Sequence, residues 1–192
     1  MPGGFPSVSF EPIDRTELNR CLVAWGHRMG AINRPSSGWS HGLRHGGELV
    51  AVVATDVLIR ARVAGFSRAE AIELSRLCAA RPELSRVVLR LWRAFVFPEL
   101  ARRRGCLWAI SYQDAALHRG DLYRFDGWVR IGRSRSGRDT RSGRVGRRKV
   151  IWGWCEDPAE RRSGRRDADG SFLHPFDAGQ YPASRAPFFM AG

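Results

Sequence analysis

Residues 111–128 hold the densest group of side chains that could do chemistry. The stretch follows an apolar run at 106–110, and polar side chains at the end of an apolar strand lie where an open α/β sheet binds its ligands. A carboxylate there, such as Asp114, can take the proton that an amine nucleophile loses as it reacts. His118 could polarise a substrate or bind a metal. The polar side chains of the stretch include Ser111, Tyr112, Asp114, His118 and Tyr123.

Each of these residues also has an ordinary structural interpretation. Asp114 could cap a following helix, because its carboxylate can accept N–H groups of the first turn. Tyr123 could pack between a helix and the sheet with its hydroxyl hydrogen-bonded, and His118 could flank a helix end at the surface. The serine and tyrosine at the strand end could line a pocket or simply pack. We therefore expect a strand, a capped helix, a glycine stop at Gly127 and another strand.

Hydrophobic patterning predicts the elements before this stretch. Thr16 is the expected N-cap of the first helix, and His45-Gly46-Gly47 is the expected turn of a hairpin. Ser67 followed by Glu70 is typical of a capping box and predicts a short helix. The expected elements are an edge strand at 7–10, a helix at 16–27, hairpin strands at 39–44 and 48–57, and a strand at 72–79.

The longest predicted helix follows and ends at Gly105. Its apolar stripe is typical of a helix that packs on a core, and Pro98 predicts a kink or a restart because proline removes an interior N–H. The stripe consists of Val88, Leu91, Trp92 and Phe95. The remaining predicted strands are 106–112, 128–132 and 150–154.

Two sequence patterns resemble known families. LYRFDGW at 122–128 resembles the LYxxxGF segment of GNAT acyltransferases. The pattern Ser-Tyr-x-Asp…His-x-Gly-x-x-Tyr at 111–123 is similar to the bacteriophage Mom family, GNAT-like proteins that convert adenine in DNA to N6-carbamoylmethyladenine and so block restriction. The similarity includes ELSRLC at 73–78 and KVIWGW at 149–154, and it covers roughly residues 20–154.

The resemblance implies an α/β fold with a GNAT-like mixed central sheet flanked by helices. A single domain over 1–155 would precede a polar, Pro-rich tail at 156–192 that is extended or partly disordered. Tyr123 matches the tyrosine that protonates the departing thiolate of coenzyme A in GNAT enzymes. The Mom family has a His-Tyr pair near His27, where this chain has Arg28 after the histidine, and His41 competes for that role. The candidate catalytic residues are thus Asp114, Tyr123, His27 and His118, and the candidate pocket residues are Ser111, Tyr112, Trp39 and Gly120.

The identity of the donor is open. GNAT enzymes that use acetyl-CoA usually have a glycine-containing turn after the fourth strand, whose backbone N–H groups hold the pyrophosphate. Residues 79–86 occupy that place and contain no glycine, although Arg81 and Arg86 could contact phosphates. The donor could be of acyl-CoA type. The cofactor could instead be iron, bound at a site formed by His27, Asp114, His118 and Tyr123.

Net charge indicates a nucleic-acid partner. The chain carries +13, and Lys149 is its only lysine. Arginine binds phosphate through a planar fork, and this balance predicts attraction to double-stranded DNA through counterion release. Residues 133–149 form a basic segment that we expect to be a loop holding the DNA backbone, or alternatively a merely solvated loop. Trp39 or Tyr112 could stack against a flipped adenine. The predicted DNA-binding residues are Arg133, Arg135, Arg138, Arg141, Arg144, Arg147, Arg148 and Lys149.

Other classes of protein are disfavoured. The four cysteines are far apart and form no C-x-x-C pair, which argues against a zinc ribbon or a disulfide framework. No apolar run approaches the roughly 20 residues that span a bilayer, and we expect a cytoplasmic protein without a membrane partner. The resemblance to the Mom family implies a phage or prophage origin. The leading hypothesis is Mom-like adenine modification. The alternatives are a GNAT N-acyltransferase acting on a small-molecule or protein amine, and a non-catalytic basic DNA-binding protein.

Overall fold

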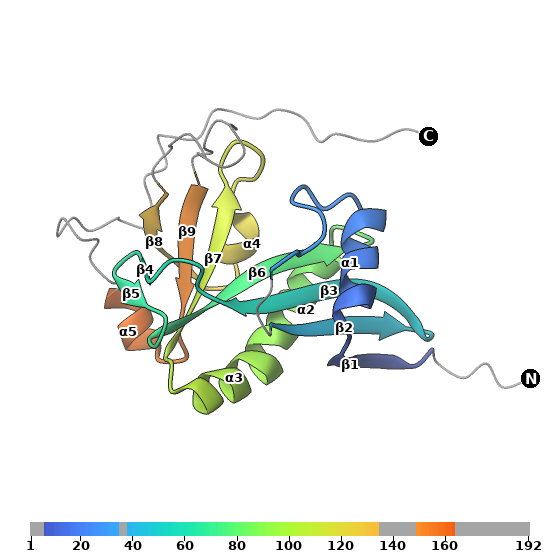
Figure 1. Cartoon of the computed structure of the whole chain (residues 1–192), viewed down its shortest axis with the longest axis horizontal. Coiled ribbons are helices and arrows are strands. Elements are labelled where there is room, and N and C mark those ends of the chain that lie inside the picture. Colours follow the sequence, from blue (N-terminus) through green and yellow to red (C-terminus); the bar gives the residue numbers. More distant parts are fainter. Residues whose placement is uncertain (1–5, 35–37, 135–148, 164–192) are drawn as a thin grey trace, which may run out of the picture.

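A computed structural model describes residues 6–34, 38–134 and 149–163. They form one seven-stranded sheet of order β1-β2-β3-β6-β7-β9-β8 and a small β4–β5 hairpin. Helix α1 covers one face of the sheet, and α2 and α3 cover the other (Figure 1). The strands are Val8–Pro12 (β1), Trp39–His45 (β2), Glu48–Val57 (β3), Arg62–Val63 (β4), Phe66–Ser67 (β5), Ala71–Ala79 (β6), Trp108–Asp114 (β7), Val129–Arg133 (β8) and Lys149–Trp154 (β9).

Helix α1 begins and ends near the predicted positions, and the long helix ends next to Gly105 as predicted. All pairs of neighbouring strands in the large sheet are antiparallel except β6 and β7. The single-domain mixed α/β architecture is therefore confirmed. The helical segments are Arg15–Ala24 (α1), Leu84–Leu91 (α2), the π-helical turn Trp92–Val96 (η1), Phe97–Arg104 (α3), Asp121–Arg124 (α4) and Pro158–Ser163 (α5).

The N-cap of α1 differs from the prediction. Asp14, and not Thr16, caps the helix, because its side chain accepts a 2.7 Å hydrogen bond from the Glu17 amide. The buried stripe of this helix is as expected, with Leu18 and Leu22 fully enclosed against the sheet. The predicted hairpin is also confirmed, since Gly46 and Gly47 both have positive φ values in its turn.

The predicted helix at Ser67–Glu70 is wrong. The Glu70 carboxylate does accept the Ser67 amide at 2.8 Å, as in a capping box. That bond closes a turn between β5 and β6 instead of starting a helix. The same local hydrogen bond serves both structures, so the pattern alone does not distinguish them.

The long helix restarts at Phe97, with Pro98 in its first turn, as the sequence predicts. The π-helical turn before it has a wider spiral, which rotates the buried face. Phe95, predicted to lie in the core stripe, is consequently 68% exposed, while Val96 and Phe97 are buried instead. Gly105 ends the helix in a left-handed conformation with a φ of 66°.

The predicted tail starts with structure. Helix α5 lies at its beginning, and residues 164–192 lie outside the described residues. Among the described residues, no helix is long and apolar enough to cross a membrane.

Candidate functional site

Strands β6 and β7 separate at their carboxyl ends. Their parallel pairing covers only Ala71–Leu74 against Trp108–Ser111, while β6 continues to Ala79. Figure 1 shows the two strands leaving a common origin in clearly different directions. A register shift against β3 places a bulge in β6 at Ser75, directly after the last pair. Beyond Leu74, β7 gives β6 no ladder partner.

Ser111 and Tyr123 meet at the vertex of this separation. The Ser111 hydroxyl lies 3.0 Å from the Leu74 carbonyl oxygen and 2.8 Å from the Tyr123 hydroxyl. A serine hydroxyl has one proton. The Leu74 carbonyl can only accept, so the Ser111 hydroxyl donates its proton to that carbonyl. Tyr123 must then donate its own proton to Ser111 Oγ. The arrangement holds a protonated tyrosine at the point where the strands diverge.

Aromatic packing fixes the Tyr123 ring. Trp152 stacks on it at a centroid distance of 5.7 Å, and Trp128 approaches edge-on at 5.3 Å. Burial raises the pKa of Tyr123 above its ordinary value, and the hydrogen bond with Ser111 only partly offsets this. The phenol therefore stays protonated at neutral pH, the form that a proton donor requires.

Tyr112 lies on the opposite face of the sheet from Ser111, because side chains alternate along a strand. Burial, reinforced by the charge of Glu73, raises the pKa of Tyr112 to about 12. Glu73 pairs with Arg34 at 3.0 Å. The Lys149 ammonium lies 5.6 Å from the Tyr112 ring centroid.

Asp114 does not cap a helix, contrary to prediction. It is the last residue of β7, and its carboxylate accepts the Ala116 amide at 3.1 Å in the following turn. The residue before α4 is Gly120, whose φ is 79°. Asp114 also faces the Arg28 guanidinium at 3.9 Å. The segment after α1 therefore lies beside the end of β7. Gly127, the predicted glycine stop, does have a left-handed conformation.

His27 lies in that same segment as a neutral imidazole. Burial, with smaller contributions from the charges of Arg76 and His118, lowers the pKa of His27 to about 4. Its Nδ1 accepts the Met29 amide at 3.3 Å, so the ring proton is on Nε2. His27 is thus a hydrogen-bond donor in this arrangement rather than a base. His118 is exposed.

Gly120 is a packing residue. An added Cβ would lie 2.5 Å from Gln113 Oε1 and 2.7 Å from Trp152 Cζ2. Gln113 accepts the Trp152 indole N–H at 2.7 Å and donates to the His118 carbonyl. The missing side chain lets this pair hold the turn that carries Asp114 and His118.

Several predicted residues lie away from this site. Trp39 packs on the α2–α3 face, where the Arg104 guanidinium is 5.8 Å from its ring centroid. His41 packs against Phe10 in β1 at a centroid distance of 5.7 Å. Arg81 is at the surface near Glu83.

Arg86 connects α2 to the far side of the separation. It donates a 3.0 Å hydrogen bond to the carbonyl of Phe125, just after α4. Within the basic segment, Arg133 is the last residue of β8 and Lys149 is the first residue of β9. The other predicted DNA-binding residues, Arg135, Arg138, Arg141, Arg144, Arg147 and Arg148, lie outside the described residues.

The four proposed iron ligands do not fit a metal site. Tyr123 is on the α2–α3 face with Ser111, whereas Asp114 is on the α1 face with Tyr112. In the described part of the chain, no group of three or more His, Cys, Asp or Glu side chains could hold a metal ion.

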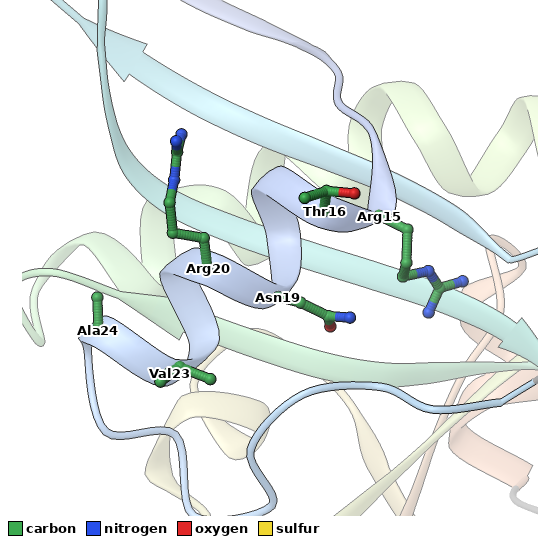
Figure 2. Close-up of a pocket in the computed structure, with 6 residues that line it drawn as sticks. All are labelled: Arg15, Thr16, Asn19, Arg20, Val23 and Ala24. Atoms are coloured by element: carbon green, nitrogen blue, oxygen red, sulfur yellow. The ribbon is translucent and has the colours of Figure 1, made fainter.

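An open groove of about 600 Å³ runs along α1 and is separate from this site (Figure 2). All its lining side chains come from that one helix, and none of them is a predicted site residue. They are Arg15, Thr16, Asn19, Arg20, Val23 and Ala24.

Sequence reasoning missed four charged residues on the α1 face: Arg34, Asp56, Glu73 and Arg76. Asp56 is fully buried and lies 3.4 Å from Arg15 and 3.9 Å from Arg34. For Asp56, Glu73 and Arg76, the signal available in the sequence was a charged residue inside an apolar strand, because charged side chains are almost never fully buried unless they are paired.

Solved structures show which fold this is. A probable acetyltransferase from Staphylococcus epidermidis aligns with a TM-score of 0.55 at 8% identity, covering 79% of this chain and all of that one. The ribosomal-protein-S18-alanine N-acetyltransferase from Escherichia coli aligns with a TM-score of 0.53 at 17% identity, and the alignment covers 78% of this chain and 94% of that one. NAA60 from Arabidopsis thaliana, solved with acetyl-CoA, aligns with a TM-score of 0.53 at 14% identity, and the alignment covers 78% of this chain and 99% of that one.

These similarities establish the GNAT acetyltransferase fold for this chain. No protein-family model matches the sequence, and no curated protein matches it either. The fold implied by the sequence resemblance is therefore confirmed, and the Mom-specific part of that resemblance stays a prediction.

Proposed function

We propose that this chain transfers an acyl group from an acyl-CoA donor to an amine, with the thioester placed between the diverging ends of β6 and β7. The observation that carries the proposal is the hydrogen-bonded Ser111–Tyr123 pair at the vertex of that separation. It provides a protonated phenol next to β6 backbone that has no partner in β7.

In the proposed reaction, the amine nitrogen attacks the thioester carbonyl and a C–N bond forms. The C–S bond then breaks, and the leaving thiolate takes the proton of Tyr123. The amine loses its own proton, which restores the phenol through solvent. Thiolate is a moderately good leaving group, since ordinary thiols have a pKa of about 8.5. The contribution expected from the acid is therefore at the low end of the usual range, about 100-fold.

Phosphate binding would differ from a glycine-turn arrangement. The segment between β6 and α2 contains Arg81 and Pro82 and no glycine. Arg86, in the first turn of α2, donates a hydrogen bond to the Phe125 carbonyl just after α4. We expect arginine side chains to supply part of the positive charge that backbone N–H groups supply elsewhere.

The test is release of free thiol from acetyl-CoA over a panel of amines. The wild-type chain should release thiol with at least one amine, and Tyr123→Phe should lower kcat about 100-fold with little change in the KM for acetyl-CoA. Tyr112→Phe is the matched control, because that tyrosine lies on the opposite face of the sheet, and it should retain kcat. Equal losses in the two variants would refute the assignment of Tyr123 as the acid.

A second candidate function is Mom-like modification of the adenine amine in double-stranded DNA. The specific observation in its favour is the net charge of +13, which is carried almost wholly by arginine and is suited to a phosphate backbone. Asp114 would then take the proton of the exocyclic amine. Its carboxylate, held near Arg28, lies on the α1 face, away from Tyr123.

Nucleoside mass spectrometry of DNA from cells that express the chain tests this candidate. A deoxyadenosine species of carbamoylmethyl mass, lost in Asp114→Asn with DNA affinity retained, would support it. Unmodified DNA after good expression, together with thiol release in the presence of small amines, would refute adenine modification and support acyl transfer to a small amine. A basic DNA-binding protein without activity predicts that Asp114→Asn changes nothing.

A further inference from the structure

Arg76 is a buried guanidinium at the point where β6 leaves β7. Its side chain is 7% exposed, and its Nη1 donates a 2.7 Å hydrogen bond to the Ser75 carbonyl. Its Nε has no hydrogen-bond partner among the described residues. Within those residues, no carboxylate lies within 4.0 Å of Arg76. A buried cation of this kind is costly unless something pairs with it.

The nearby acids already have partners. Asp56 lies 3.4 Å from Arg15, and Glu73 lies 3.0 Å from Arg34. Asp56 is also 3.9 Å from Arg34 and accepts a hydrogen bond from Ser75. The cluster therefore contains more guanidinium groups than carboxylates. Burial, followed by the charge of Arg34, lowers the pKa of Arg76, which nevertheless stays charged at neutral pH.

Arg76 lies close to the point where β6 and β7 separate. It pairs with Ala54 in β3 and lies two residues beyond Leu74, the last β6 residue paired with β7. At about 3.3 Å per residue, its Cα is roughly 7 Å from the vertex. Arg76 lies on the α1 side, because side chains alternate along a strand and Cys78, two residues further on, packs against α1. Its charge also contributes to the low pKa of His27. An acceptor that approaches the separation of β6 and β7 from the α1 side would therefore pass Arg76.

We propose that Arg76 binds a carboxylate of the acceptor, so that the acceptor is a small amine of amino-acid type. This inference rests on the acyl transfer proposed above. A carboxylate supplies the missing negative charge and two oxygens that match the guanidinium fork. A phosphodiester within DNA would bring a bulky strand to a side chain that is almost fully enclosed. Arg130 also has an unpaired buried Nε, but it lies on β8, at the far edge of the sheet from β6.

The experiment compares amino acids with their amides as acceptors of acetyl groups from acetyl-CoA. The wild type, Arg76→Gln and Arg76→Lys are measured side by side, with Arg102→Gln on the exposed end of α3 as the control. The amide has the less basic amine, so its larger free-amine population works against the expected preference. Melting temperatures with each amino acid, without acetyl-CoA, give a readout that does not depend on turnover.

The expected result is a preference of about 10- to 100-fold in kcat/KM for the amino acid over its amide. Arg76→Gln should abolish that preference by raising the KM for the amino acid. The kcat/KM for the amide should stay within about twofold of the wild-type value. Arg76→Lys should keep part of it. Arg102→Gln should behave as wild type. The melting temperature of Arg76→Gln should not fall, because the variant removes an unpaired buried charge.

Other outcomes overturn the proposal. Equal kcat/KM values of the wild type for amino acids and their amides would refute the carboxylate site. An Arg76→Gln variant that lowers kcat/KM equally for both acceptors would also refute it. A preference for malonyl-CoA over acetyl-CoA that requires Arg76 would place the carboxylate on the donor instead. If no acetyl-CoA-dependent product forms, the proposed function fails. The melting temperatures then test the role of Arg76 separately. A carboxylate bound to Arg76 should raise the melting temperature of the wild type with an amino acid and leave that of Arg76→Gln unchanged.

Discussion

Replacing Gly120 with alanine should destabilise the fold far more than the same change at Gly127. Both glycines have left-handed conformations, with φ values of 79° and 80°. A non-glycine residue pays about 1–2 kcal/mol there. The two sites differ in space. The new methyl group would be 2.5 Å from Gln113 Oε1 at position 120, but 3.5 Å from Trp154 at position 127.

The steric difference can be converted to free energy. Relief of the clash at Gly120 must move Gln113, which holds the Trp152 indole N–H and the His118 carbonyl. Each of these two hydrogen bonds contributes about 1 kcal/mol. We therefore expect Gly120→Ala to lower the free energy of unfolding by about 3–4 kcal/mol and Gly127→Ala by about 1–2 kcal/mol. The first is a large fraction of a typical total of about 5–15 kcal/mol.

Urea unfolding followed by circular dichroism measures both variants under identical conditions. The slope with urea should be the same as in wild type, so that the midpoint shift reports stability. Equal losses for the two variants would refute the packing role assigned to Gly120, because only the shared conformational cost would then remain.

Two further predictions concern pH dependence and the core. His27 has a pKa of about 4 in the folded chain against an ordinary 6.5, so the unfolded chain binds more protons between these values. Stability from this group is complete above pH 6.5 and is lost as pH falls toward 4; His27→Asn should flatten urea midpoints over that window, and an unchanged slope would contradict the burial. Trp92 donates its indole N–H to the Thr55 hydroxyl at 2.7 Å in the core, so Trp92→Phe should cost about 2–3 kcal/mol. Thr55→Val in the Trp92→Phe background should cost little more, and fully additive losses in a double-mutant cycle would count against the bond.

The order of strands and helices could be predicted from local patterns, and the errors occurred where one local pattern serves two structures. Asp14 and Thr16 are both acceptable helix caps, and only the actual start of α1 decides between them. The Ser67–Glu70 hydrogen bond closes a turn as well as it starts a helix. Phe95 left the core because a π-helical turn rotated the helix face, and no spacing rule in the sequence marks such a turn.

The site was only partly predictable for a different reason. Asp114 and Tyr123 were identified from one continuous stretch, but strand alternation and the position of α4 place them on opposite faces of the sheet. Pairing between β6 and β7 brings Ser111 to Leu74, which lies 37 residues earlier in the chain. The charged cluster around Arg76 combines residues of β3, β6 and the segment after α1. Such long-range contacts depend on the fold as a whole.

Hydrogen–deuterium exchange with and without acetyl-CoA tests most directly the claim that the donor binds between β6 and β7. Acetyl-CoA should slow exchange at residues 75–79, whose amides on the β7 side have no ladder partner, and in the first turn of α2. The control peptide covers β1 and β2, which should not change. Protection confined to the α1 groove, or none at saturating acetyl-CoA, would contradict the account.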